Sequence, residues 1–247
     1  MIFTVAAKEL KTLFATPLAW IVIALLQLVF AWIFLTSLNT FLGVQPQLLQ
    51  LSNPPGATEF IAAPLFGSVA IVLLMAVPLL SMRLIAEERR NQTLPFLFSA
   101  PLSMSEIILG KFLGLLLFLT LIIGLAALMA LSLGLGTQPD YGLIAGNVLG
   151  LLLLLACYAA LGLFISCLAA QPVVAAMLTL GALLGLWIID AAAGAPDSWL
   201  HWLSLLKHFE NFNRGLIDTA DVAFLLLFTV VFLALAIRRL DADRLRG

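Results

Sequence analysis

The sequence predicts an all-α integral membrane protein with six transmembrane helices. Of the 247 residues, 63% are hydrophobic and 10% are charged, and the mean hydropathy is +1.16. Soluble domains carry roughly 25% charged residues, so this composition excludes a soluble globular fold. A bilayer span needs about 20 mainly apolar residues. Six stretches meet this requirement, at about 18–38, 60–82, 107–134, 142–168, 172–190 and 221–239.

We expect a short interfacial helix in residues 1–16, ahead of a single transmembrane domain at 17–247. Charged residues group on one side of this helix and apolar residues on the other, a pattern typical of a helix that lies in the membrane interface. The charged side holds Lys8, Glu9 and Lys11. Pro17 then ends this helix and stands at the favoured first position of the next one.

Two pairs of glycines predict places where helices approach each other closely. Gly110 and Gly114 lie four residues apart in the third span, and Gly146 and Gly150 have the same spacing in the fourth. Small residues at this spacing allow two helix backbones to come together in a membrane.

Two segments are expected on the outer side. Residues 39–59 contain several prolines and are predicted to form a loop. Residues 197–217 place large apolar side chains at helical spacing, which predicts an amphipathic helix whose apolar face rests on the membrane surface. These side chains are Trp199, Trp202, Leu203, Leu206 and Phe209.

The distribution of basic residues predicts that both termini are cytoplasmic. With the amino terminus inside, ten of the twelve basic residues fall on the cytoplasmic side, and only Lys207 and Arg214 fall outside. Cytoplasmic loops of membrane proteins carry such an excess of Lys and Arg. We therefore expect a multi-pass membrane protein with both termini on the cytoplasmic side.

The charged loop at 83–106 is the main polar feature of the chain. It mixes acidic and basic residues with Leu94, Phe96, Leu97 and Phe98. Exposed apolar residues framed by charges usually mark a contact surface, although a solvated connector that only fixes topology is the simpler alternative. Ser103 or Ser105 is expected to cap the next helix.

The sequence offers little evidence for catalysis. It contains no zinc-protease motif and no phosphate-binding glycine loop, and the middles of the spans carry essentially no ionisable groups. His201 and His208 are two helical turns apart, too far for one metal ion without rearrangement. We expect no catalytic residue, metal or nucleic-acid partner, and we interpret Cys157 and Cys167 as packing residues.

The charged loop carries a recognisable pattern. The run EERRNQTL (87–94), continued by SAPLS (99–103) and Glu106 to Lys111, resembles the signature loop of ABC-2 type ABC transporter permeases. It departs from the family pattern at Gln92, where glycine is common, and at Pro95, where glutamate is common. The segment FENFNRGLID (209–218) is similar to the gliding-motility and nitrous-oxide-reductase-maturation branch.

This resemblance implies six transmembrane helices after an elbow helix, and pairing with a second permease subunit, identical or related. It also implies that the loop forms a coupling helix on an ATP-binding cassette ATPase subunit, which holds ATP and Mg²⁺, so that this chain binds no cofactor. The implied contact residues are Glu87, Glu88, Arg89, Arg90, Thr93, Leu94, Phe96, Leu97 and Phe98. An outer re-entrant gating helix would include Trp199, Trp202, Leu206, Phe209 and Arg214.

The function implied is that of a transmembrane permease subunit that couples ATP hydrolysis on another subunit to movement of a substrate, in the direction of export. The alternative is a membrane scaffold or assembly factor of an envelope complex, with no transport of its own. Few polar groups line the spans, which suits a lipid-like, polymeric or amphipathic cargo better than an ion. Membrane lipid and a large extracytoplasmic subunit are further partners consistent with this reading.

Overall fold

The structure is a computed structural model that describes residues 1–48, 56–94, 102–192 and 204–246. Within these ranges the chain forms helices and short connections and no strand, which confirms the predicted fold class. The helices are α1 (Ile2–Ala15), α2 (Pro17–Leu48), α3 (Ala57–Ser81), α4 (Ala86–Arg90), α6 (Met104–Leu131), the 3₁₀ helix η1 (Ser132–Leu135), α7 (Tyr141–Leu168), α8 (Pro172–Ala192), α9 (Leu205–Asn213) and α10 (Thr219–Arg246).

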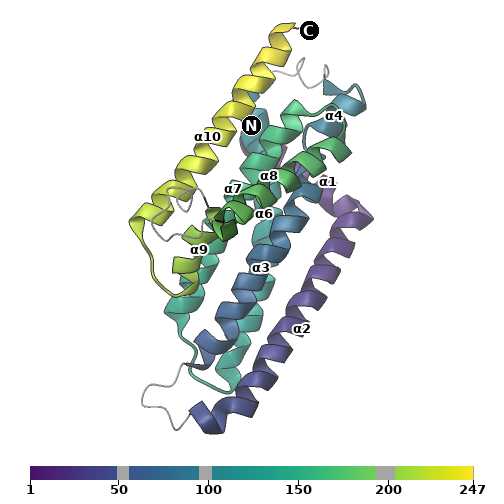
Figure 1. The fold of residues 1–247 in the computed structure, drawn as a ribbon. Helices are drawn as coiled ribbons and strands as arrows, with labels where there is room; N and C mark the ends of the chain where they lie inside the picture. The colour runs from purple at the N-terminus through teal and green to yellow at the C-terminus, as the bar shows by residue number, and fades with distance from the viewer. Residues whose placement is uncertain (49–55, 95–101, 193–203, 247) are drawn as a thin grey trace.

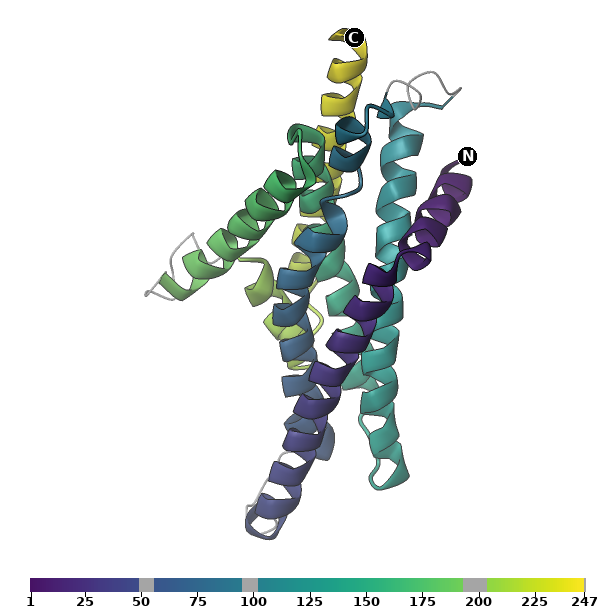
Figure 2. The same cartoon turned by 90° about the vertical axis from the view of Figure 1, so that its right-hand side faces the viewer.

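Among the described residues, five helices are long and apolar enough to cross a membrane: α2, α3, α6, α7 and α10. The fifth predicted span, 172–190, corresponds to α8, whose apolar part, Pro172–Ile188, is shorter. At about 1.5 Å per residue this part is about 25 Å long, against about 30 Å for the hydrocarbon core. Figure 2 shows α8 inclined to the other helices.

The first span is longer than predicted. Helix α2 continues to Leu48 with Pro46 inside it, so the part of the predicted loop at 39–48 is helical; residues 49–55 lie outside the described ranges. Proline removes the backbone donor at its own position and disturbs the preceding turn. The described helix nevertheless includes Pro46, so the loop prediction gave this proline too much weight.

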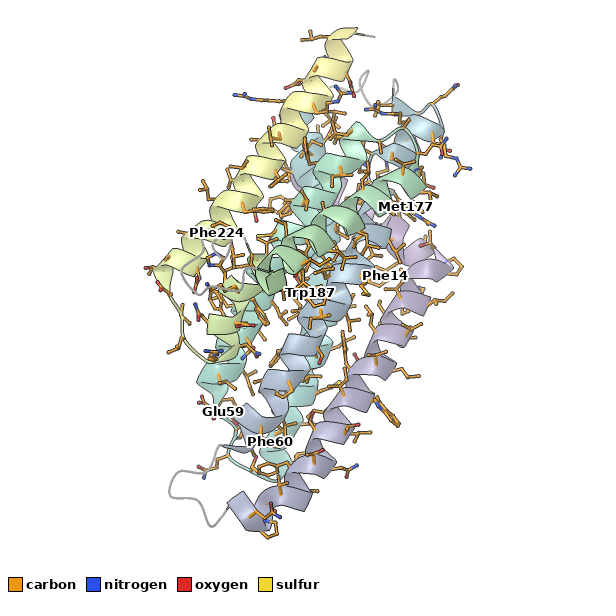
Figure 3. All side chains as sticks on the ribbon, viewed as in Figure 1. Phe14, Glu59, Phe60, Met177, Trp187 and Phe224 are labelled. Atoms are coloured by element: carbon orange, nitrogen blue, oxygen red, sulfur yellow. The ribbon has the colours of Figure 1, made fainter. Side chains whose placement is uncertain are left out.

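Helix α7 is the centre of the bundle. It packs against α3, α6, α8, α9 and α10, and most of its apolar residues are buried, whereas most of those in α2 are not. Both chain termini lie at the end of the bundle that carries α4, and Glu59 and Phe60 lie at the opposite end (Figures 1 and 3). We refer to these as the α4 end and the opposite end.

The amino-terminal helix lies against α6 at the predicted glycine pair. A Cβ atom at Gly110 would be 2.6 Å from Val5 Cβ, and one at Gly114 would be 2.8 Å from Glu9 Cβ. These distances are too short for any larger residue, so the glycines allow α1 to lie directly on the α6 backbone. The prediction of close helix contact at this pair is confirmed.

Candidate functional site

Helix α4 is short, and a side chain from another helix caps its amino terminus. Ser166 Oγ on α7 accepts hydrogen bonds from the backbone N–H groups of Ile85 and Ala86, each at 3.1 Å, and donates to the carbonyl of Met82 at 3.1 Å. The first N–H groups of any helix lack partners inside the helix. Ser166 is fully buried, so it satisfies these groups where water does not reach.

Replacing Ser166 by alanine is therefore expected to destabilise the α4 end by about 2 kcal/mol, because two buried N–H groups lose their acceptor. Thermal unfolding of the purified protein measures this change. Thr179→Val is the matched control, since the buried Thr179 hydroxyl donates to the carbonyl of Ala175 in its own helix. Equal losses in the two variants would contradict the capping role.

Glu88 on α4 contacts a buried lysine on α6. Lys111 Nζ lies 2.8 Å from Glu88 Oε1 and 3.2 Å from Glu9 Oε2 on α1. The lysine side chain is only 4% exposed. One cation is thus shared by two carboxylates from two different helices, a pairing that buried charges require.

Arg89 points to the other side of α4. Its guanidinium donates to the carbonyl of Cys167 at 2.9 Å, at the end of α7, and forms an ion pair with Asp243 on α10. Asp243 is also 3.3 Å from Arg239, one turn earlier in α10. Through Glu88 and Arg89, two consecutive residues, α4 is connected to α1, α6, α7 and α10.

The structure divides the predicted contact residues into separate groups. Glu88 and Arg89 are engaged within the chain, and Leu94 is 9% exposed and packs in the core. Arg90 and Thr93 are exposed, and Glu87 is partly exposed. Phe96, Leu97 and Phe98 lie outside the described residues.

Gln92 occupies the position where glycine is common in the pattern. Its φ is 56°, in the left-handed region that glycine adopts most easily. The backbone at this position therefore has the conformation that a glycine adopts easily, although the residue is glutamine. After the turn, Ser103 caps α6 in a capping box with Glu106, which confirms the first of the two predicted caps.

Farther from α4 along the bundle, α9 packs on the second predicted glycine pair. A Cβ atom at Gly150 would be 2.6 Å from Phe212 Cβ, and one at Gly146 would be 3.7 Å from the Phe212 carbonyl oxygen. Phe209 and Phe212 are buried, and Leu206 is partly buried. The apolar face of α9 within Leu205–Asn213 thus packs on protein, and its predicted contact with the membrane surface is wrong for this part. The apolar face of α9, which was expected to rest on lipid, lies instead on Gly146 and Gly150 of α7.

Of the other predicted gating residues, Arg214 is exposed, 3.9 Å from Glu210, and Trp199 and Trp202 lie outside the described residues. A buried polar group between α9 and α10 was not predicted from the sequence. Asp221, near the start of α10, contacts His208 Nδ1 at 2.6 Å and accepts from Asn211 at 2.7 Å. His208 also stacks on Phe224, labelled in Figure 3, with ring centroids 4.1 Å apart.

Within the described ranges, no group of three or more His, Cys, Asp or Glu side chains is arranged to hold a metal ion. His201 lies outside these ranges. The polar contacts described above join side chains and backbone groups from different helices.

Comparison with protein families decides the class of the molecule. The family described as ABC-2 family transporter protein matches residues 3–245, nearly the whole chain. The chain belongs to this family. A comparison with curated proteins found no match. This ABC-2 family protein is a multi-pass membrane protein, and its family consists of membrane transport subunits that are not themselves catalytic and that generally pair with an ABC ATPase.

Proposed function

We propose that this chain is the permease subunit of an ABC exporter and that α4 receives the movement of a separate ATPase subunit. The observation that carries this proposal is the anchoring of α4. A five-residue helix at the α4 end is tied by Ser166, Lys111, Asp243 and the carbonyl of Cys167 to helices across the bundle. Because α4 is attached in this way, a displacement of α4 by a partner subunit would be transmitted to the helices that cross the membrane.

We choose the residues proposed to contact the ATPase by the exposure of their side chains. Arg90 and Thr93 point away from the bundle, with Glu87 partly exposed beside them. Glu88 and Arg89 have the supporting role, because they hold α4 in place. Phe96, Leu97 and Phe98 continue the same loop and stay in the proposed contact set on the strength of the sequence pattern alone.

The proposal places the α4 end in the cytoplasm of a bacterial cell, with both termini there and the chain in the inner membrane. The excess of basic residues at this end supports that orientation. ATP and Mg²⁺ bind the ATPase subunit, and a second permease subunit completes the pathway. α9 lies on the outer side and gates it, and the similarity of residues 209–218 supports the gliding-motility and nitrous-oxide-reductase-maturation branch.

Charge reversal at Arg90 tests the proposal. Arg90→Glu is expected to weaken binding of the ATP-binding subunit by about 2 kcal/mol, roughly thirtyfold, because arginines at interface centres contribute on this scale. The measurements are co-purification of the two subunits and ATP hydrolysis by the complex in lipid.

The matched control is Arg214→Glu, which makes the same change on an exposed arginine at α9. Its binding should stay within twofold of the unmodified protein. Equal weakening by both variants, or by neither, contradicts the proposed contact. A complex that forms but shows no nucleotide-dependent change would instead identify a scaffold.

A further inference from the structure

Lys111 is the one charged residue of α6 beyond its first turn, and it is buried. Its ammonium group reaches Glu9 on α1 at 3.2 Å and Glu88 on α4 at 2.8 Å. The two carboxylates are 13% and 20% exposed, and the lysine is 4% exposed. One positive and two negative charges meet where little water is present, so each carboxylate depends on the same cation.

The helices joined in this way pack on different neighbours. Helix α1 packs mainly on α6 and α2, whereas α4 packs on α7 and α8. Although α6 and α7 also pack on each other directly, Lys111 adds a polar contact that joins α1 to α4. Apolar packing at Gly110 and Gly114 holds α1 to α6 but does not reach α4.

The environment of the second carboxylate oxygen of Glu88 also indicates that this residue depends on Lys111. Among the described residues, Glu88 Oε2 is buried and has no hydrogen-bond partner. The ion pair with Lys111 therefore stabilises the Glu88 carboxylate in this position. Loss of the lysine would leave an unpaired charge, and Glu88 would turn toward water, taking α4 with it.

We propose that Lys111 is a positioning residue that makes α1 and α4 move as one unit, so that a displacement of α4 reaches the amino-terminal helix. This inference deepens the proposed function and rests on it for its meaning in transport. The bridge formed by Glu9, Lys111 and Glu88 lies within this chain, so it can be tested without an ATPase.

Hydrogen–deuterium exchange of the purified protein in lipid nanodiscs tests the bridge with three variants. Glu88→Gln, which keeps the shape of the side chain, is expected to raise the exchange of α4 amides roughly tenfold and to leave α1 unchanged. Glu9→Gln should raise exchange in α1 and leave α4 unchanged. Lys111→Met should raise exchange in both helices, with α3 and α7 unaffected.

Lys8→Met is the matched control, because it removes a lysine from the exposed side of α1 and should change neither helix. A general loss of stability would raise exchange across the whole bundle, so the selective pattern separates positioning from mere structural support. Unchanged α4 exchange in Glu88→Gln, or equal effects on both helices in both glutamine variants, overturns the inference.

A second arm uses the complex with the ATP-binding subunit. In the unmodified complex, ATP is expected to change the exchange of both α4 and α1, and in Glu88→Gln it should change α4 only. Persistence of the α1 response in Glu88→Gln overturns the inference. Failure of any ATP-binding subunit to bind refutes the proposed function instead, while the result on the permease alone stands.

Discussion

Replacing Gly150 by leucine is expected to detach α9 from the bundle. The first added carbon would lie 2.6 Å from Phe212 Cβ and 3.1 Å from a ring carbon of Phe209. Both phenylalanines are buried, and each contributes about 1.5–3 kcal/mol through burial, so displacement of α9 should cost about 5 kcal/mol locally. Hydrogen–deuterium exchange of Leu205–Asn213 measures the detachment.

Gly124→Leu is the control for this substitution. Gly124 is also inside a long helix, α6, but a Cβ atom there meets nothing within 4 Å. Exchange in α9 should be normal in this variant. If Gly150→Leu left α9 as protected as before, close packing of α9 on α7 would be wrong. If α9 gates the outer side, the Gly150 variant should also hydrolyse ATP without moving substrate.

Replacing Asp221 by leucine is expected to give the second largest loss, about 4 kcal/mol. The side chain of Asp221 is 8% exposed, and its carboxylate is hydrogen-bonded to His208 and Asn211; each such bond to a charged group contributes about 1.5–3 kcal/mol. Leucine has a similar size and offers no acceptor, so α9 loses its polar contact with α10. The midpoint of thermal unfolding reports the change.

Asp241→Leu provides the comparison, because Asp241 is an exposed residue of the same helix and its substitution should cost less than about 0.5 kcal/mol. A loss at Asp221 no greater than the loss at Asp241 would show that the buried polar group does not hold α9. Intact exchange protection of α9 in Asp221→Leu would lead to the same conclusion.

The sequence predicted the fold well because the bilayer restricts what an apolar chain can form. Runs of about 20 apolar residues must be helices, since backbone groups in hydrocarbon need internal partners. The paired glycines identified the places where α1 and α9 approach other helices. The glycine spacing could not say which helix would lie on each pair, because that choice depends on tertiary contacts.

The contacts of the charged loop were the less predictable part. A run such as EERR gives the charge of each residue but not its direction, and a five-residue helix turns successive side chains by about 100°. Glu88 and Arg89 consequently point to different neighbours, and Arg90 points outward. Their partners Lys111 and Asp243 are 23 and 154 residues away, so no local pattern could reveal them.

The ion pair between Arg89 and Asp243 has a consequence for biosynthesis. The arginine leaves the ribosome 154 residues before its partner, an interval of about 8 to 30 s at usual rates of translation. During that time α4 lacks the attachment to α10. Under the function proposed above, a polypeptide that ends before residue 243 would present α4 to the ATPase without its attachment to α10, held only by its contacts with Ser166, Lys111 and the carbonyl of Cys167 among the described residues.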